Sequence, residues 1–288
     1  MNNLSDINTI KAILSRHKFN FSHSLGQNFI VNPNVCPEMA ALSGAGENVG
    51  VLEIGPGIGV LTRELAALAQ KVVSVELDQR LLPILDETLA GFSNVKIING
   101  DILKLDLSKI IQDEFYNMDV VVCANLPYYI TSPVITKLIE EKLTINSITI
   151  MVQKEVANRI CAGAGHKETS AFSIFINYYC NAEFLFDVKK ENFIPSPKVD
   201  SAVIKLNIKK GLSFNVADEK TFFKVVKAAF LQRRKTVSNS LSSGLGISKE
   251  KILEVLKDSQ IEPNSRAENL SMQQFFNLSN IIFKEFIK

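Results

Sequence analysis

The chain has 288 residues, of which 46% are hydrophobic and 22% charged, and its formal net charge is +2. This length exceeds the usual size of one domain, so one large domain and a smaller one are expected. No apolar run approaches the roughly 18 residues of a membrane span, and residues 1–25 lack the apolar block of a signal peptide. These features argue against a membrane-spanning or exported protein and predict a cytoplasmic one.

The four cysteines, Cys36, Cys123, Cys161 and Cys180, lie far apart and form no C-x-x-C pair. Buried thiols in a reducing compartment explain this spacing better than a disulfide or a zinc site does. The sequence therefore predicts no metal centre.

The first thirty residues contain two different segments. Residues 1–20 carry isoleucines on one face of a possible amphipathic helix. The next segment, Phe21–Ile30, is polar, and it carries Gln27, Asn28 and Phe29 together. It could pack as an ordinary loop or fold over a ligand as a lid, and the residues alone leave both possibilities open.

A glycine loop follows the first predicted strand. In Val49–Thr62, a short apolar run ends in Gly55, Gly57 and Gly59, and a helical pattern comes next. A strand, a glycine loop and a helix in this order indicate a nucleotide-like ligand at the carboxyl edge of a parallel sheet. The spacing is G-x-G-x-G, with Pro56 in the turn, and not the G-x-G-x-x-G of dinucleotide sites. A ligand without phosphates fits this loop better.

Two acidic residues follow the next two predicted strands. Glu76 ends the β-branched run that begins at residue 72, and it lies 21 positions beyond Gly55, where an acid can accept hydrogen bonds from both ribose hydroxyls of an adenosine. Asp101 follows the strand predicted at Val95–Ile98, where a carboxylate can accept a hydrogen bond from an adenine amine. An Asp that only caps a turn is the alternative there.

The fourth predicted strand, Val120–Ala124, leads into Asn125, Leu126, Pro127 and Tyr128. An adenine amine is a poor nucleophile because its lone pair is delocalised into the ring. If the Asn125 side-chain oxygen and the carbonyl of Leu126 or Pro127 each accept one amine hydrogen, the nitrogen becomes more nearly tetrahedral. Tyr128 can stack on the base. This motif predicts methyl transfer to an adenine.

Seven motifs together resemble those of the ribosomal RNA adenine N6-dimethyltransferases, also called dimethyladenosine transferases. In chain order they are SLGQNFI, EIGPGIGVLT, VVSVELD, NGDIL, NLPYYITSP, ENFIPSPKVDSAV and FLQRRKTVSNSL, which span nearly the whole chain. The NLPY form favours the enzyme that modifies two adjacent adenines near the 3′ end of small-subunit (16S) ribosomal RNA. The resemblance implies S-adenosylmethionine as the methyl donor.

The resemblance also implies which residues bind this cofactor. In the family, the residues that match Asn28 and Ile30 close over the cofactor. The residues that match Gly55 and Glu76 bind its methionine end and its ribose, and the residue that matches Asp101 binds its adenine.

For the target base, the resemblance implies that Asn125 contacts cofactor and adenine together, and that Tyr128 and Phe193 form two aromatic walls. Two stretches depart from the family pattern. Phe21, Ser22 and His23 stand where lysines are usual. KETSAFS at residues 167–173 replaces a segment in which an Arg is expected.

The fold class that follows is α/β. Further strands at 148–153, 184–188 and 201–208, with helices at 132–142, 154–160 and 171–179, complete a Rossmann-like class I methyltransferase domain over residues 1–208. Its sheet is expected to be seven-stranded and mostly parallel, with an antiparallel last strand. The helix at 171–179 is ambiguous by period and rests on the resemblance.

Residues 209–288 form the second predicted domain. They hold 14 Lys and Arg against 8 Asp and Glu, a net charge of +6, whereas the first 208 residues hold 18 against 22, a net charge of −4. Apolar spacing predicts helices at 221–231, 249–257 and 272–287. Arg233, Arg234 and Lys235 begin the most basic stretch, for which the resemblance implies contact with RNA phosphates.

The sequence thus predicts an enzyme that dimethylates two adjacent adenines in the 3′-terminal hairpin loop of small-subunit ribosomal RNA. We expect it to act as a monomer on immature subunits. Three alternatives remain: a nicotinamide oxidoreductase, a noncatalytic ribosome-assembly or RNA-binding factor, and a large-subunit RNA or DNA adenine methylase.

Overall fold

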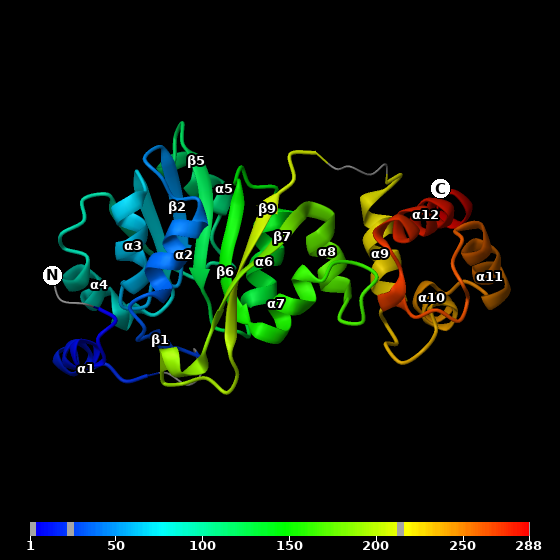
Figure 1. Cartoon of the computed structure of the whole chain (residues 1–288). Helices are drawn as coiled ribbons and strands as arrows, with labels where there is room; N and C mark the ends of the chain where they lie inside the picture. The colour runs from blue at the N-terminus through cyan, green and yellow to red at the C-terminus, as the bar shows by residue number, and fades with distance from the viewer. Residues whose placement is uncertain (1–3, 22–25, 212–215, 288) are drawn as a thin grey trace. The chain divides into compact units, whose positions relative to one another are not determined.

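The computed structural model describes residues 4–21, 26–211 and 216–287 of the chain (Figure 1). The chain forms two compact units. The first comprises Met1–Ala157 and Glu183–Ile208, and the second comprises Asn158–Ala182 and Lys209–Lys288. One division point follows Ile208. Residues 158–182, which the sequence prediction assigned to the catalytic domain, belong to the helical unit.

A seven-stranded sheet forms the centre of the first unit. Its strands are β2 (Val49–Ile54), β3 (Lys71–Glu76), β4 (Val95–Asn99), β5 (Asp119–Asn125), β6 (Ser147–Gln153), β7 (Cys180–Val188) and β9 (Ser201–Ile208). They lie in the order β4-β3-β2-β5-β6-β9-β7. The neighbours from β4 to β6 pair in parallel, and β9 pairs with β6 in the antiparallel sense. The predicted seven-stranded, mostly parallel sheet is confirmed.

The strands are apolar on both faces because helices cover both sides of a parallel sheet. Val51 and Val121 are in register on β2 and β5 and belong to the core cluster that contains the side chains of α2 and α3. Leu52 and Val122, one residue further along, are also fully buried but point to the opposite face. This pattern fixes the register, since a shift of one residue would exchange the two faces.

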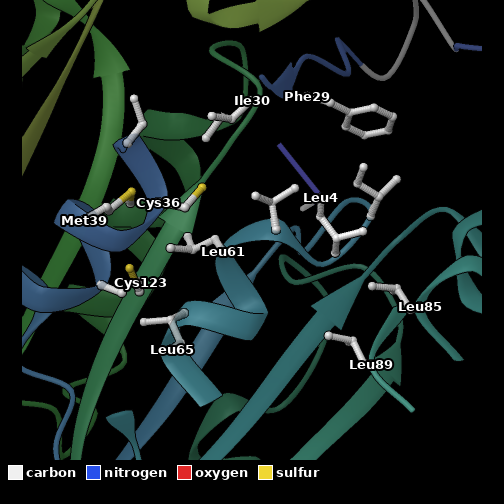
Figure 2. Packing of buried hydrophobic residues seen from close by; sticks show 14 of the residues in the cluster. Leu4, Phe29, Ile30, Cys36, Met39, Leu61, Leu65, Leu85, Leu89 and Cys123 are labelled. Atoms are coloured by element: carbon white, nitrogen blue, oxygen red, sulfur yellow. The ribbon is translucent and has the colours of Figure 1, made fainter. Parts of the chain in front are cut away.

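The helices of the first unit are α1 (Ile7–Arg16), α2 (Val35–Ser43), α3 (Val60–Leu68), α4 (Leu82–Thr88), α5 (Leu107–Glu114) and α6 (Thr131–Glu140). Helix α7 (Lys154–Cys161) begins in this unit, and its residues from 158 onward belong to the second. A short 3₁₀ turn, Gln79–Leu81, precedes α4. Helix α2 packs against α3, β5 and β6. Figure 2 shows this packing, with Cys36 and Met39 of α2 close to Leu61 and Leu65 of α3 and to Cys123 of β5.

A second, two-stranded sheet lies outside the main one. It pairs β1 (Phe29–Ile30) with β8 (Phe193–Ile194) in the antiparallel sense, so that Ile30 lies opposite Phe193. A 3₁₀ turn, Lys190–Asn192, leads into β8, and the Asn192 carbonyl accepts a 2.8 Å hydrogen bond from the Val31 amide. This pairing joins two segments that are more than 160 residues apart, and no local sequence pattern predicts it.

The second unit is helical, as predicted. It contains α8 (Ala171–Tyr179), α9 (Glu219–Ala229), α10 (Val237–Leu245), α11 (Lys249–Asp258) and α12 (Met272–Ile282), with a 3₁₀ turn at Ala267–Asn269 and a π-helical turn at Phe283–Ile287. Aromatic rings fill its core: the Phe222 ring stacks on Tyr178 and on Phe276, with centroids 5.0 Å and 5.1 Å apart.

Residues 167–173 are the second stretch that departs from the family pattern. Within it, Ser170 caps the start of α8 through a reciprocal pair of hydrogen bonds with Ser173. The first departure, at Ser22 and His23, lies outside the described residues. Within the described ranges, no helix combines the length and apolar character that a membrane crossing requires.

Candidate active site

The site lies at the carboxyl edge of the main sheet, where the order of the strands reverses. The chain proceeds from β2 to β3 and β4 on one side, and β5 then returns to the other side of β2. Ligands of open α/β sheets bind at such a switch point. A cavity of about 340 Å³ opens here. It is lined by all ten residues predicted for the cofactor and the target base: Asn28, Ile30, Gly55, Glu76, Asp101, Asn125, Leu126, Pro127, Tyr128 and Phe193.

The glycine loop, which connects β2 to α3, lines this cavity. Gly55, Gly57 and Gly59 have φ angles of +72°, +60° and +88°, in the left-handed region that other residues rarely adopt. A Cβ added to Gly57 would lie 3.3 Å from Cε1 of Phe29, so the loop backbone approaches the segment before α2 closely. Glycine is therefore required here both for the turn and for this contact.

Glu76 is buried at the end of β3. Its Oε1 accepts a 2.7 Å hydrogen bond from the Asp78 amide, and its Oε2 accepts a 3.4 Å bond from the Gly57 amide. Burial raises the pKa of this carboxyl above its usual value. A carboxylate has about four acceptor positions, so Glu76 retains acceptor capacity for the hydroxyls of a ribose. The arrangement therefore fits the predicted ribose contact.

Asp101 lines the same cavity beyond β4 and also stabilises a turn. Its Oδ1 accepts a 3.0 Å hydrogen bond from the Leu103 amide, and Oδ2 lies 3.5 Å from the exposed Lys104 ammonium. The two interpretations given by the sequence are thus compatible, since the turn orients a carboxylate that still has acceptor capacity toward the cavity.

Asn125 is the last residue of β5, and the carbonyls that follow it are not equivalent. The Pro127 carbonyl already accepts the Ile130 amide at 3.1 Å and the Thr131 hydroxyl at 3.4 Å. Both of its lone pairs are therefore occupied. The Leu126 carbonyl accepts no hydrogen bond from the rest of the described chain. Of the two carbonyls that the sequence left open, Leu126 is the available one.

Tyr128 is held by its hydroxyl group. This hydroxyl lies 2.7 Å from Oγ of the buried Ser201 at the start of β9, and burial raises the pKa of the phenol. Phe193, the other predicted wall, is buried in β8 beside Ile30. Both line the cavity, but the ring contacts within the described residues do not include a Tyr128–Phe193 pair.

The segment before β1 is held by contacts with the turn after β3, which no local sequence pattern predicts. Gln27 donates a 2.8 Å hydrogen bond to Asp78. The Asp78 carboxylate also accepts hydrogen bonds from Nε and Nη2 of Arg80, at 2.8 Å and 2.6 Å. These Arg80 hydrogen bonds lower the pKa of Asp78. Arg80 also donates to the Asn20 carbonyl at 3.3 Å. The residues from Gly26 to Ile30 therefore line the cavity. The Gln27–Asp78 hydrogen bond holds the start of this segment, and the pairing of β1 with β8 holds its end.

Three predicted residues lie elsewhere. Arg233, Arg234 and Lys235 are exposed in the loop between α9 and α10 of the second unit and do not line the cavity. Among the residues with described positions, no group of three or more His, Cys, Asp or Glu is arranged to hold a metal ion.

Comparison with known proteins agrees with this geometry. The sequence pattern of the family described as ribosomal RNA adenine dimethylase matches residues 18–284. Ribosomal RNA small subunit methyltransferase A of Clostridioides difficile (strain 630) is 45% identical over 287 residues, which cover 98% of each chain. The enzyme of the same name from Bacillus mycoides (strain KBAB4) is 46% identical over 286 residues, again 98% of each chain.

Solved structures agree as well. A dimethyladenosine transferase from Plasmodium falciparum is similar over 89% of this chain and 98% of its own, with 26% identity and a TM-score of 0.75. The 23S rRNA methyltransferase ErmE is similar over 87% and 98%, with 26% identity and a TM-score of 0.68. The Rossmann-like class I methyltransferase fold is thus confirmed. By its sequence over nearly its whole length, this chain belongs to the ribosomal RNA adenine dimethylase family.

Proposed function

We propose that this enzyme transfers methyl groups from S-adenosylmethionine to N6 of two adjacent adenines in the 3′-terminal hairpin loop of small-subunit (16S) ribosomal RNA. The observation that carries the proposal is the single cavity lined by all ten residues predicted for cofactor and base. The family assignment supports adenine methylation and not hydride transfer to a nicotinamide.

The choice of the small subunit rests on two observations. The motif that begins at the last residue of β5 is NLPY. The relatives named for the small subunit are 45% to 46% identical to this chain, whereas ErmE, which is named for 23S RNA, is 26% identical. Because ErmE nevertheless shares the fold, small-subunit specificity is a matter of individual contacts and needs a direct test.

The cavity fits the proposed cofactor. The positive φ angles of the glycine loop allow close approach of the backbone, and the buried Glu76 retains acceptor capacity for ribose hydroxyls. The Asp101 carboxylate lines the same cavity and retains acceptor capacity that suits an adenine amine, and Asn28 and Ile30 also line this cavity. When bound, S-adenosylmethionine supplies a methyl group that its positive sulfur makes electrophilic.

The protein contributes orientation and two hydrogen-bond acceptors. Oδ1 of Asn125 and the free carbonyl of Leu126 each accept one hydrogen of the adenine amine, which directs the nitrogen lone pair toward the methyl carbon. With the donor bound, N6 would take the methyl group as the sulfur–carbon bond breaks, and the methylated amine would then lose a proton to water. Tyr128 and Phe193 hold the base, which must first leave its stacked position in the RNA.

We propose that residues 1–208 form the catalytic domain and residues 209–288 an RNA-binding domain. The loop with Arg233, Arg234 and Lys235 supports this because its side chains are exposed and cationic, and neutralised phosphates give a salt-dependent affinity. Replacing all three by alanine should weaken RNA binding and flatten the plot of log affinity against log salt by about 0.7 to 0.9 per lost contact. Lys249→Ala, on the exposed side of α11, is the matched control, and an equal slope in both variants would contradict this role.

We further infer that the substrate is an immature small ribosomal subunit, that the enzyme acts as a monomer, and that it acts in the cytoplasm, where such particles assemble. The predicted absence of a catalytic metal is retained as part of this proposal, and activity in the presence of a chelator would test it.

The direct experiment offers labelled S-adenosylmethionine to the purified enzyme with unmodified small subunits, large subunits and free DNA, and then identifies the labelled nucleoside. Dimethyladenosine in small-subunit RNA alone is expected. Label in large-subunit RNA or DNA would overturn the substrate assignment. Cofactor binding without transfer to any of the three would favour a noncatalytic assembly factor.

A further inference from the structure

Tyr129 is an exposed aromatic residue at the active-site cavity. It follows the NLPY motif directly and lines the same cavity, yet 59% of its surface is exposed. An exposed tyrosine offers a flat apolar ring to a ligand, and Tyr is enriched at binding interfaces for this reason. Nothing in the mechanism above uses this ring.

The geometry leaves much of the ring open. A Cβ added to Gly26 would lie 3.5 Å from Cε1 and 3.7 Å from Cδ1 of Tyr129, and 3.3 Å from Cβ of Pro127. The Gly26 backbone therefore supports one side of the ring. Across the described residues, the Tyr129 hydroxyl forms no hydrogen bond and the ring meets no other aromatic ring. Tyr128 differs, because its hydroxyl is bound to Ser201 and its ring is partly buried.

Two other exposed apolar side chains, Leu77 and Leu103, line the cavity as well. They follow Glu76 and Asp101 closely in the chain, at the end proposed for the ribose and adenine of the cofactor. Tyr129 instead follows the residues proposed to hold the target base. The exposed ring is thus placed on the RNA side of the cavity.

We propose that Tyr129 is a stacking platform for the RNA base that adjoins the target adenine. The inference rests on the proposed function and extends it by one nucleotide. When the target base leaves its stack, its neighbour loses a stacking partner. An exposed aromatic ring can replace that partner, and stacking of this kind tolerates any base because every base has a π face.

The test compares Tyr129→Ala, Tyr129→Leu and Tyr129→Phe. Leucine retains apolar surface without a π face, and phenylalanine retains the ring. The matched control is Tyr116→Ala, which removes another exposed tyrosine, 77% exposed, in the turn before β5 and hence at the opposite edge of the sheet. For transfer to unmodified small subunits, the alanine and leucine variants should raise KM by about 5-fold to 100-fold. The phenylalanine and control variants should stay within about 2-fold of the unchanged enzyme.

A spectroscopic measurement separates stacking from a structural effect. An RNA hairpin that carries 2-aminopurine on either side of the target pair, each position in turn, is bound to each variant in the presence of S-adenosylhomocysteine. Stacking on Tyr129 should quench the fluorescence at one of these positions. Tyr129→Ala and Tyr129→Leu should lose this quenching, and Tyr129→Phe and Tyr116→Ala should keep it.

Unchanged KM and quenching in Tyr129→Ala, with normal methyl transfer by the unchanged enzyme, would overturn the inference and leave the proposed function intact. Weakened cofactor binding in calorimetry with an unchanged KM for RNA would also overturn it, by placing Tyr129 against the cofactor. Failure of the unchanged enzyme to methylate the small subunit would instead refute the proposed function.

Discussion

Replacing Glu53 by glutamine should remove a pH-dependent loss of stability. Glu53 lies fully buried in β2, between Leu52 and Ile54, and Oγ of Ser74 donates a 2.6 Å hydrogen bond to its Oε2. Burial raises the pKa of this carboxyl from an ordinary value of 4.5 to about 7. Glutamine has nearly the same shape and can accept the same hydrogen bond, but it carries no charge at any pH.

The size of the effect follows from the two pKa values. Between pH 4.5 and about 7 the folded protein keeps a proton that the unfolded chain releases, so the free energy of unfolding falls as the pH rises. Above about pH 7 both states are ionised and the loss is complete. At 1.36 kcal/mol for each pKa unit, the total loss is about 3 kcal/mol.

The assay is urea unfolding followed by circular dichroism, since the chain contains no Trp. The free energy of unfolding of Glu53→Gln minus that of the unchanged protein should increase by about 3 kcal/mol between pH 4.5 and pH 8. Asn48→Gln, at an exposed and uncharged position just before β2, serves as the control and should give a difference that does not change with pH. A pH-independent difference for Glu53→Gln would refute the reasoning.

Three further changes probe the site and its support. Glu76→Gln should weaken S-adenosylmethionine binding about 10-fold to 100-fold in calorimetry, because charged hydrogen bonds contribute about 1.5–3 kcal/mol; unchanged affinity would contradict the ribose role. Tyr128→Phe and Ser201→Ala should each lower kcat/KM about 5-fold, because both remove the same 2.7 Å hydrogen bond. The double variant should lower kcat/KM no further than either single variant, and additive losses would contradict a role for this hydrogen bond. Gly50→Ala should lower the free energy of unfolding by about 1–3 kcal/mol, since its Cβ would overlap the Phe115 ring, and an unchanged urea midpoint would refute this.

The sheet could be predicted from the sequence because its strands are short β-branched runs that end in glycine or polar residues. Val72–Glu76 and Val120–Ala124, for example, match β3 and β5 to within one residue at each end. Three helices of the first unit, α2, α4 and α5, were not predicted. Each is only seven to nine residues long, and α4 starts with a proline in its first turn, so their periodicity is weak.

Helix α10 was missed for a different reason. Its sequence, VSNSLSSGL, contains four serines and a glycine, which are poor helix formers. Packing determines its structure: a Cβ on Gly244 would lie only 2.7 Å from Cβ of Ala228, so the glycine allows α10 to approach α9 closely. Local propensity cannot reveal such a contact.

The cavity residues on the main sheet could be predicted because each of them follows a strand, and parallel strands bring their carboxyl ends to one edge. The β1–β8 pairing and the hydrogen bond from Gln27 to Asp78 could not. Both join segments far apart in the chain, and neither has a local pattern. For the same reason, the sequence could not choose between the carbonyls of Leu126 and Pro127, since the choice depends on the amide of Ile130.

The measurement that tests the central claim most directly is single-turnover methyl transfer by Asn125→Ala to unmodified small subunits, beside calorimetry of S-adenosylmethionine binding. Loss of the amide acceptor should slow transfer by about 100-fold to 1000-fold, the usual effect of removing one such transition-state contact. Cofactor affinity should fall by no more than about 10-fold, the effect of one lost hydrogen bond. Asn48→Ala, at an exposed position before β2, should transfer methyl groups normally. Near-normal transfer by Asn125→Ala would contradict the assignment of this cavity as the centre of adenine methylation.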